Sequence, residues 1–303
     1  MNKNIDKKTS FTRRDFIKGA SCAALGLAMG VSAESQNVTK TPSGTKIILI
    51  RDKNVIGAKG KYDPEIIQNM IDRSINKLFD VDSPVKAWKT MFKPDDIVGI
   101  KTNIWGPLPT PPEVEQSLKK GIMSAGVSED NISIDDRGIL GNEIFKNATA
   151  VVNTRPMRTH HWAGVGGLIK NHIMFAPEPW LYHDNSCADL AKVWELPNIK
   201  GKTRLNILVM MTPLFHGIGP HHFDKEFTWK YNGLLVGTDP VALDAVGLHI
   251  LMAKRKIHFG EEKPMKPSPH HIAFADTKHH LGVADMNKIN LIKLGWDEDI
   301  LIG

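Results

Sequence analysis

Hydrophobic and polar positions alternate with two different periods from about residue 45 onward. Short apolar runs predict buried strands over residues 46–50, 96–102, 131–135, 148–153, 205–211, 233–237 and 289–294. Between them, apolar residues recur at helical spacing over 64–78, 112–125 and 240–253, and each of these segments begins at a proline, which suits the first position of a helix. Strands that alternate with helices in this way predict βαβ units and a mostly parallel sheet.

The segment 162–200 has no clear period and is rich in Gly, Pro, His and Trp, which predicts active-site or connecting loops with short helices. We therefore expect residues 45–303 to form an α/β domain of mostly parallel sheets with flanking helices. The expected arrangement is two fused Rossmann-like lobes, 45–157 and 158–303, with a cleft between them.

The residues before 45 follow another pattern. Arg13 and Arg14 precede an apolar stretch over 19–30, which is shorter than the roughly 20 residues of a membrane-spanning helix, and small residues follow at 31–33. This order predicts a twin-arginine signal peptide over 1–33, cleaved after Ala33, and a polar linker over 34–44. A cytoplasmic amphipathic helix is the alternative. The signal predicts the twin-arginine translocase as a partner during export, a folded protein in the periplasm, and no stable membrane span after cleavage.

The signal peptide also changes the charge and the chemistry that the rest of the chain can offer. Residues 1–33 hold six basic and two acidic side chains, so cleavage removes four of the six net positive charges. A nearly neutral chain gives no footprint for nucleic acid, and a small-molecule ligand is expected instead. Only Cys187 remains, which excludes an iron–sulfur cluster held by this chain alone. A metal would need histidine and carboxylate ligands, and all 13 histidines lie at or after His160.

Six motifs are spread over the expected domain. They occupy residues 98–103, 110–114, 160–170, 217–220, 238–245 and 281–285. In combination they resemble the domain-of-unknown-function family 362, over about residues 46–295. Many members of that family carry cysteine-rich ferredoxin segments, and this chain has none. The family is largely uncharacterised, so the resemblance implies a fold more than a function.

The motif at 160–170 is similar to a segment of nickel-pincer lactate racemases. Four residues fall in register with that segment: His160, Ala163, Gly164 and Lys170. The glycine pair 166–167 comes one residue early, and the nickel-ligating histidine has no counterpart at the same spacing, although His172 and His183 follow. The resemblance implies that His160 is an acid/base and that Lys170 tethers a cofactor, with glycines that let a flat ligand approach. A loop that binds an anion is the alternative.

Further polar side chains follow the predicted strands, where open α/β sheets bind ligands. Lys101 and Asn103 end the strand 96–102, Asp136 follows 131–135, and two arginines precede His160. We expect Lys101 to act with His160 and Lys170 in catalysis. The expected substrate-binding residues are Asn103, Arg155, Arg158 and Asp136. Solvated loops and surface charges are the alternative.

Two other groups stand out. His216, His221 and His222 follow the strand 205–211 and could hold zinc, nickel or iron, although adjacent histidines on an extended chain point to opposite sides. Asp244 is a carboxylate within an otherwise apolar helix, so we expect either a capping role or a place in a site.

Together these patterns favour an exported enzyme with a transition metal or a pincer-type cofactor. Its expected substrate is a small anion such as a hydroxy acid, and its chemistry that of an isomerase or an oxidoreductase. Two alternatives stay open. One is a non-catalytic periplasmic partner that binds a metal or cofactor or matures a redox system. The other is an exported folded protein without a cofactor.

Overall fold

A computed structural model describes residues 44–217 and 223–303. The predicted signal peptide with Arg13 and Arg14, the predicted linker up to residue 43, and His221 and His222 lie outside these residues.

The described residues form eight strands in one sheet, in the order β3-β2-β4-β6-β7-β1-β8, with β5 paired to the end of β4. Along this order only β7 runs against its neighbours, β6 and β1. The bounds are β1 Thr45–Arg51, β2 Val98–Lys101, β3 Ile132–Asp135, β4 Ala150–His160, β5 Gly164–Gly166, β6 Thr203–Leu214, β7 Gly233–Gly237 and β8 Ile289–Gly295. The expected α/β class and mostly parallel sheet are therefore confirmed.

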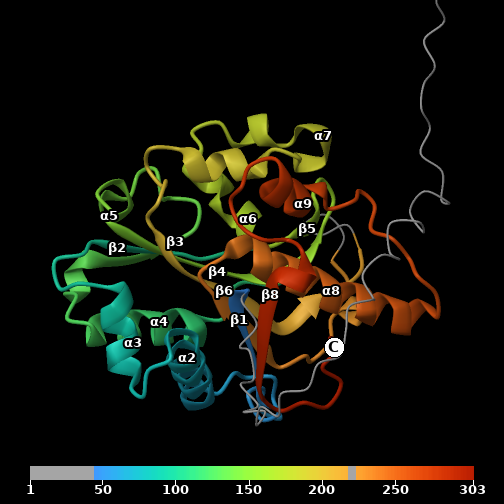
Figure 1. The fold of residues 1–303 in the computed structure, drawn as a ribbon, viewed down its shortest axis with the longest axis horizontal. Coiled ribbons are helices and arrows are strands. Elements are labelled where there is room, and N and C mark those ends of the chain that lie inside the picture. The colour runs from blue at the N-terminus through green and yellow to red at the C-terminus, as the bar shows by residue number, and fades with distance from the viewer. Residues whose placement is uncertain (1–43, 218–222) are drawn as a thin grey trace, which may run out of the picture. The chain divides into compact units, whose positions relative to one another are not determined.

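Helices cover both faces of the sheet (Figure 1). Helices α2 (Pro64–Phe79), α3 (Pro84–Met91) and α4 (Pro112–Ser124) pack on one face, and α6 (Leu168–Asn171), α8 (Pro240–Phe259) and α9 (His270–Thr277) on the other. Two short helices, α5 (Glu143–Lys146) and α7 (Asp184–Cys187), lie in connections. The segment 162–200 carries short helices as expected, including the 3-10 turns His172–Phe175, Pro179–Tyr182 and Leu190–Glu195.

The two longest helices, α2 and α8, begin where the sequence predicts, because their first turns are capped. The carboxylate of Asp63 accepts hydrogen bonds from the N–H groups of Glu65 and Ile66 at the start of α2. Asp239 caps α8 in the same way. These caps satisfy backbone donors that have no partner inside a helix, and each is worth about 1 kcal/mol.

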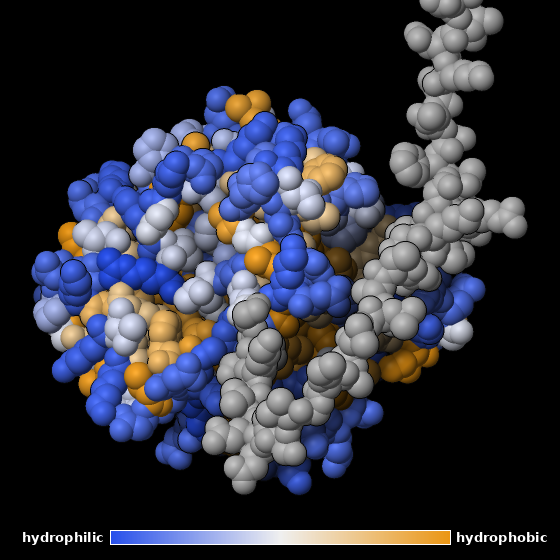
Figure 2. Space-filling model, in the orientation of Figure 1, coloured by the Kyte–Doolittle hydropathy of each residue, from blue (hydrophilic) through white to orange (hydrophobic). Residues whose placement is uncertain are grey.

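Alternation along the strands divides the core between the two faces. In β1, Ile48 and Ile50 pack against the α2 side, whereas Ile47 and Leu49 pack against α8. All four side chains are buried, which explains why the strand reads as an unbroken apolar run. Hydrophilic residues cover most of the outer face shown in Figure 2.

The two-lobed arrangement is not confirmed. The expected boundary at 157/158 falls inside β4, a single strand of 11 residues, and strands from both halves of the chain share one sheet. The reason is that β4 pairs with β2 on one side and with β6 on the other.

The order of strands places a special point between β2 and β4. The chain leaves β2 for β3 on one side and leaves β4 for β6 on the other, so the connections diverge at this pair. In open α/β sheets such a divergence leaves a crevice at the carboxyl ends of the strands, where ligands bind.

None of the helices within 44–217 and 223–303 has the length and apolar character that a membrane span requires.

Candidate active site

A pocket of about 320 Å³ lies at the carboxyl ends of β2 and β4. Its walls come from the loops after β2 and β3, from the last half of β4, and from α6 with the turns that follow it. Six of the residues that the sequence indicates line it: Asn103, Asp136, Arg155, Arg158, His160 and Lys170. A larger hollow of about 570 Å³ between α2 and α4 is lined by exposed charges such as Glu65 and Lys120 and holds none of these residues.

Two arginines of β4 form the cationic wall of the pocket. Arg155 is 3% exposed and Arg158 is 5% exposed. Neither guanidinium has a carboxylate within ion-pair distance anywhere in the described residues. Their hydrogen bonds are long, 3.4 Å to the carbonyl of Pro156 and 3.5 Å to that of Thr159, and Arg155 Nη2 and Arg158 Nε have no partner.

The position of these arginines follows from the lengths of the strands. β2 ends at Lys101, opposite Asn153, whereas β4 continues to His160. Beyond Asn153, residues 154–157 of β4 have no strand beside them on that edge, and β5 then pairs with residues 158–160. Arg158 packs over the ring of Trp105, with 4.3 Å between the guanidinium carbon and the ring centre.

Burial lowers the pKa of both arginines, but both stay protonated at neutral pH. Desolvation lowers the pKa of Arg155 to about 10, although the carboxylates of Asp136 and Asp244 act to raise it. Desolvation and then the charge of Arg155 lower the pKa of Arg158. Guanidinium groups stay charged at neutral pH, so the pocket holds two buried positive charges.

Lys170, on α6, adds an amine to this wall. It is 5% exposed, and its Nζ lies 3.1 Å from Nε2 of His183 and 3.9 Å from Sγ of Cys187. Desolvation lowers the pKa of Lys170 to about 8, with Arg155 and Arg158 acting in the same direction and Cys187 against it. Desolvation also lowers the pKa of His183, to about 4, so that its ring is neutral and can accept a hydrogen bond from the amine.

His160 has a fixed tautomer. Its Nδ1 accepts a hydrogen bond of 3.2 Å from the N–H of Trp162 in the turn between β4 and β5. Desolvation, followed by the charge of Lys170, holds the pKa of His160 far below its usual value, so the ring is neutral. The hydrogen is then on Nε2, which makes this form a hydrogen-bond donor. A role as base, which the sequence predicts, would require the bond to Trp162 to break.

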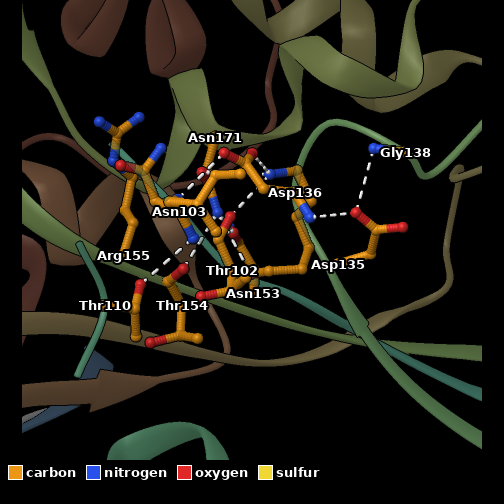
Figure 3. A network of polar contacts seen from close by, with 12 residues as sticks. Thr102, Asn103, Thr110, Asp135, Asp136, Gly138, Asn153, Thr154, Arg155 and Asn171 are labelled. Carbon is orange, nitrogen blue, oxygen red and sulfur yellow. Dashed lines mark hydrogen bonds and ion pairs between the residues drawn. The ribbon is translucent and has the colours of Figure 1, made fainter. Parts of the chain in front are cut away.

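Lys101 lies beneath the pocket and does not line it, contrary to its expected place in the cleft. Its side chain is fully buried and forms an ion pair with Asp136, a hydrogen bond of 2.7 Å to the carbonyl of Thr102 and a contact of 3.5 Å to Asn171. Figure 3 shows this region, with Asn103, Asp136 and Asn171 gathered near the guanidinium of Arg155.

The ion pair sets the charge of both partners. Desolvation lowers the pKa of Lys101 to about 8, and Asp136 opposes that change. Desolvation acts to raise the pKa of Asp136, but the ammonium of Lys101 and the N–H of Ile104 bring it below its usual value. The pair neutralises the carboxylate at the pocket floor, and within the described residues the arginines have no carboxylate at ion-pair distance.

The glycines of the motif have structural reasons within the chain. A Cβ on Gly166 would lie 2.9 Å from Nη2 of Arg155, and one on Gly167 would lie 2.2 Å from a carboxylate oxygen of Asp244. That carboxylate is fully buried and accepts the N–H groups of Leu168 and Ile169 at 2.7 and 2.9 Å, so it caps α6. The glycine pair therefore faces protein atoms and does not fit the role of a platform for a flat cofactor.

Of the three predicted metal ligands, the described residues include His216 alone, and it does not line this pocket. His216 lines another hollow, and its Nδ1 lies 3.2 Å from Nη1 of Arg255. Desolvation and the charge of Arg255 lower the pKa of His216. No group of three His, Cys, Asp or Glu side chains suited to a metal occurs in the part of the chain that the structure describes. Because His221 and His222 lie outside that part, the metal site stays a prediction.

Among the other lining residues, Trp105 and Asn171 were not considered from the sequence, and His183 was considered only as a nickel ligand at a different spacing. Trp105 could have been found as an aromatic residue in the loop after β2. Asn171 directly follows Lys170, and its amide donates to Asn153 at 2.8 Å. No local pattern marks His183 as a neighbour of Lys170, because the two meet only through the turns between α6 and α7.

The chain is thus an α/β protein with a positively charged pocket at the carboxyl edge of its sheet. Residues 127–249 match the family described as "Domain of unknown function (DUF362)". The match spans less than half of the chain and includes Asp136, Arg155, Arg158, His160 and Lys170, and it supports the family resemblance over that segment. Neither the curated proteins nor the solved structures contain a match to this chain.

Proposed function

We propose that this protein is an enzyme that binds a small carboxylate substrate, such as a hydroxy or oxo acid, in the pocket at the ends of β2 and β4. One observation carries the proposal: Arg155 and Arg158 are buried, line the pocket and have no carboxylate partner in the described ranges. A buried charge without a partner is strongly unfavourable, so a bound anion would supply the missing counter-charge.

The remaining groups suit the handling of such a substrate. A carboxylate can accept paired hydrogen bonds from a guanidinium, and the ring of Trp105 packs against that of Arg158. The donor form of His160 can hydrogen-bond a second oxygen of the substrate. A pocket of about 320 Å³ lies at the small end of the range for ligand sites.

Calorimetric titration with oxalate, and with its neutral analogue oxamide, tests the proposal. Oxalate should bind and oxamide should not, because the site recognises charge. The substitution Arg155→Met should weaken oxalate binding about 10- to 100-fold, since a buried charged contact is lost. Arg73→Met, which removes an exposed arginine of α2, should leave it unchanged. Equal binding of the two probes, or no effect of Arg155→Met, would overturn the proposal.

A non-catalytic periplasmic partner of a redox system is the alternative, and it would share the pocket. Lys170 and His160 favour an enzyme, because groups whose pKa is strongly shifted gather at catalytic sites. Nuclear magnetic resonance of mixtures of 2-hydroxy and 2-oxo acids distinguishes the two. Chemical conversion that Lys170→Arg abolishes supports the enzyme, whereas binding without conversion supports the alternative.

We also propose that the protein acts in the periplasm after export by the twin-arginine route, for which Arg13 and Arg14 are the support. Fractionation of cells that produce the full chain tests this. The periplasm should contain protein shortened by residues 1–33, and the double substitution Arg13→Lys/Arg14→Lys should retain full-length protein in the cytoplasm. Equal distribution of the two forms would contradict export by this route.

A further inference from the structure

Lys170 differs from an ordinary buried lysine in what surrounds its amine. Its Nζ contacts the neutral ring of His183 at 3.1 Å and the thiol of Cys187 at 3.9 Å. No carboxylate in the described sequence lies within ion-pair distance of it. The amine can therefore lose its proton without leaving a buried anion unpaired.

The surroundings also favour the neutral amine. Arg155 and Arg158 line the same pocket, and their positive charges oppose a third one on Lys170. Desolvation and neighbouring cations are the two means by which proteins turn a lysine into a nucleophile at neutral pH. With a pKa of about 8, a useful fraction of Lys170 is unprotonated there.

The turn that carries Cys187 is also unusual. Asn185, Ser186 and Cys187 all have positive φ, at 47°, 56° and 63°. Side chains other than glycine adopt this conformation at an energetic cost, and such strain persists where the surroundings enforce it, often beside a functional site. Here it holds the buried thiol, and not a carboxylate, against the amine of Lys170.

We infer that Lys170 forms an imine with the carbonyl carbon of a small oxo acid whose carboxylate is held by Arg155 and Arg158. The inference rests on the proposed function, because it needs the carboxylate site, and it narrows the substrate class from small carboxylates to those with an aldehyde or ketone group. The volume of the pocket limits such a substrate to a few carbon atoms.

The reaction balances within the groups at the pocket. The lone pair of Nζ attacks the carbonyl carbon, a C–N bond forms, and the π bond of the carbonyl breaks so that its oxygen becomes an alkoxide. One N–H proton passes to this oxygen by way of His183, at 3.1 Å, and gives a carbinolamine. The nitrogen lone pair then forms the C=N bond as the C–O bond breaks, and the hydroxyl group leaves as water with the second N–H proton. Amine and carbonyl thus give imine and water, with no oxidant or reductant.

Reductive trapping tests the inference. The purified protein is incubated with pyruvate and sodium cyanoborohydride, and its intact mass and peptides are measured. The mass should rise by that of pyruvic acid less one oxygen atom, and the adduct should lie on Lys170. Lys170→Arg keeps the charge and should abolish the adduct. Arg155→Met should lower the labelling rate about tenfold or more, because the carboxylate contact is lost.

The controls distinguish failure of the imine from failure of the pocket. Pyruvamide, which lacks the carboxylate, should label Lys170 more slowly than pyruvate, and Lys101 should stay unlabelled because it is fully buried and ion-paired. Thermal unfolding shows that each variant is folded. If oxalate binds but pyruvate labels only exposed lysines, or none, the imine is wrong and the carboxylate site stands. If oxalate does not bind either, both are wrong.

Discussion

Lys101 and Lys170 are two buried lysines on the same side of the sheet edge, and the pKa of each is lowered to about 8. The first is ion-paired with Asp136 and hydrogen-bonded to a carbonyl. The second meets a neutral imidazole and a thiol in a pocket that two arginines already make positive. The two lysines thus have a similar pKa in different surroundings. The groups that each amine contacts, and not its pKa, distinguish the structural lysine from the reactive one.

This difference extends to the regions around the two lysines. The Lys101 region is neutralised internally, because the ammonium pairs with Asp136 and also donates to Asn171, whose amide in turn donates to Asn153. The pocket region keeps unpaired guanidinium groups, which lower the stability of the empty protein. Natural sequences break local rules of this kind at functional sites.

The largest expected change in stability comes from breaking the ion pair between Lys101 and Asp136. Lys101→Met leaves the carboxylate of Asp136 buried without a cation, which should lower the free energy of unfolding by ~3–5 kcal/mol. Urea unfolding at pH 7 measures this. The double variant Lys101→Met/Asp136→Leu should recover part of the loss, because no unpaired charge remains. A loss below ~1 kcal/mol for the single variant would contradict a structural role for Lys101.

Asp244 sharpens the comparison, because its fully buried carboxylate is held by backbone N–H groups instead of an ion pair. Asp244→Ala leaves the N–H groups of Leu168 and Ile169 without an acceptor at the start of α6. The free energy of unfolding should fall by ~2–4 kcal/mol, and trapping of pyruvate on Lys170 should slow. Asp244→Asn keeps one acceptor oxygen, so its free energy of unfolding should lie between that of the unaltered protein and that of Asp244→Ala. Unchanged stability of the alanine variant would refute the capping role.

In the pocket, where the arginines have no carboxylate partner, removal of a charge should not lower stability. Arg155→Met removes a buried charge that has no partner, so stability without ligand should stay the same or rise by ~1–4 kcal/mol. Arg204 is the matched control, because its guanidinium contacts both oxygens of Asp96 at 2.5 and 2.9 Å, and Arg204→Met should destabilise. Thermal and urea unfolding in a buffer of low anion content measure both. A clear loss of stability in Arg155→Met would contradict the view that Arg155 is a buried charge without a partner.

The last expected effect is on the pH dependence of stability. The pKa of Lys170 is about 8 in the folded state and about 10.4 in the unfolded state, so the unfolded state binds more protons between these values. Lys170 should therefore make stability rise with pH over this window, by up to ~3 kcal/mol. Lys170→Met should flatten the rise seen in urea unfolding between pH 7 and 10. An identical slope in the variant would show that Lys170 titrates as an exposed lysine.

Much of the fold could be predicted from the sequence, because it depends on local signals. The predicted helices 64–78, 112–125 and 240–253 correspond to α2, α4 and α8, whose starts are set by a proline and, in α2 and α8, by an aspartate cap. The single sheet could not be predicted, because it depends on the length of β4 and on its pairing with both β2 and β6.

The pocket could be predicted in part for the same reason. Asn103 and Asp136 follow strands, and parallel strands bring their carboxyl ends together. The difference between Lys101 and Lys170 could not be predicted, because it depends on Asp136 and His183, which meet these lysines only in the folded chain. Likewise, position 167 has no room for a side chain, because Asp244, distant in the sequence, occupies the adjoining space.

We propose that Arg155 and Arg158 hold a carboxylate, and a crystal structure of the protein grown with oxalate is the most direct test. We expect oxalate oxygens within hydrogen-bond distance of both guanidinium groups, in the pocket at the ends of β2 and β4. A pocket without oxalate, or guanidinium groups paired with carboxylates of the chain itself, would contradict the claim.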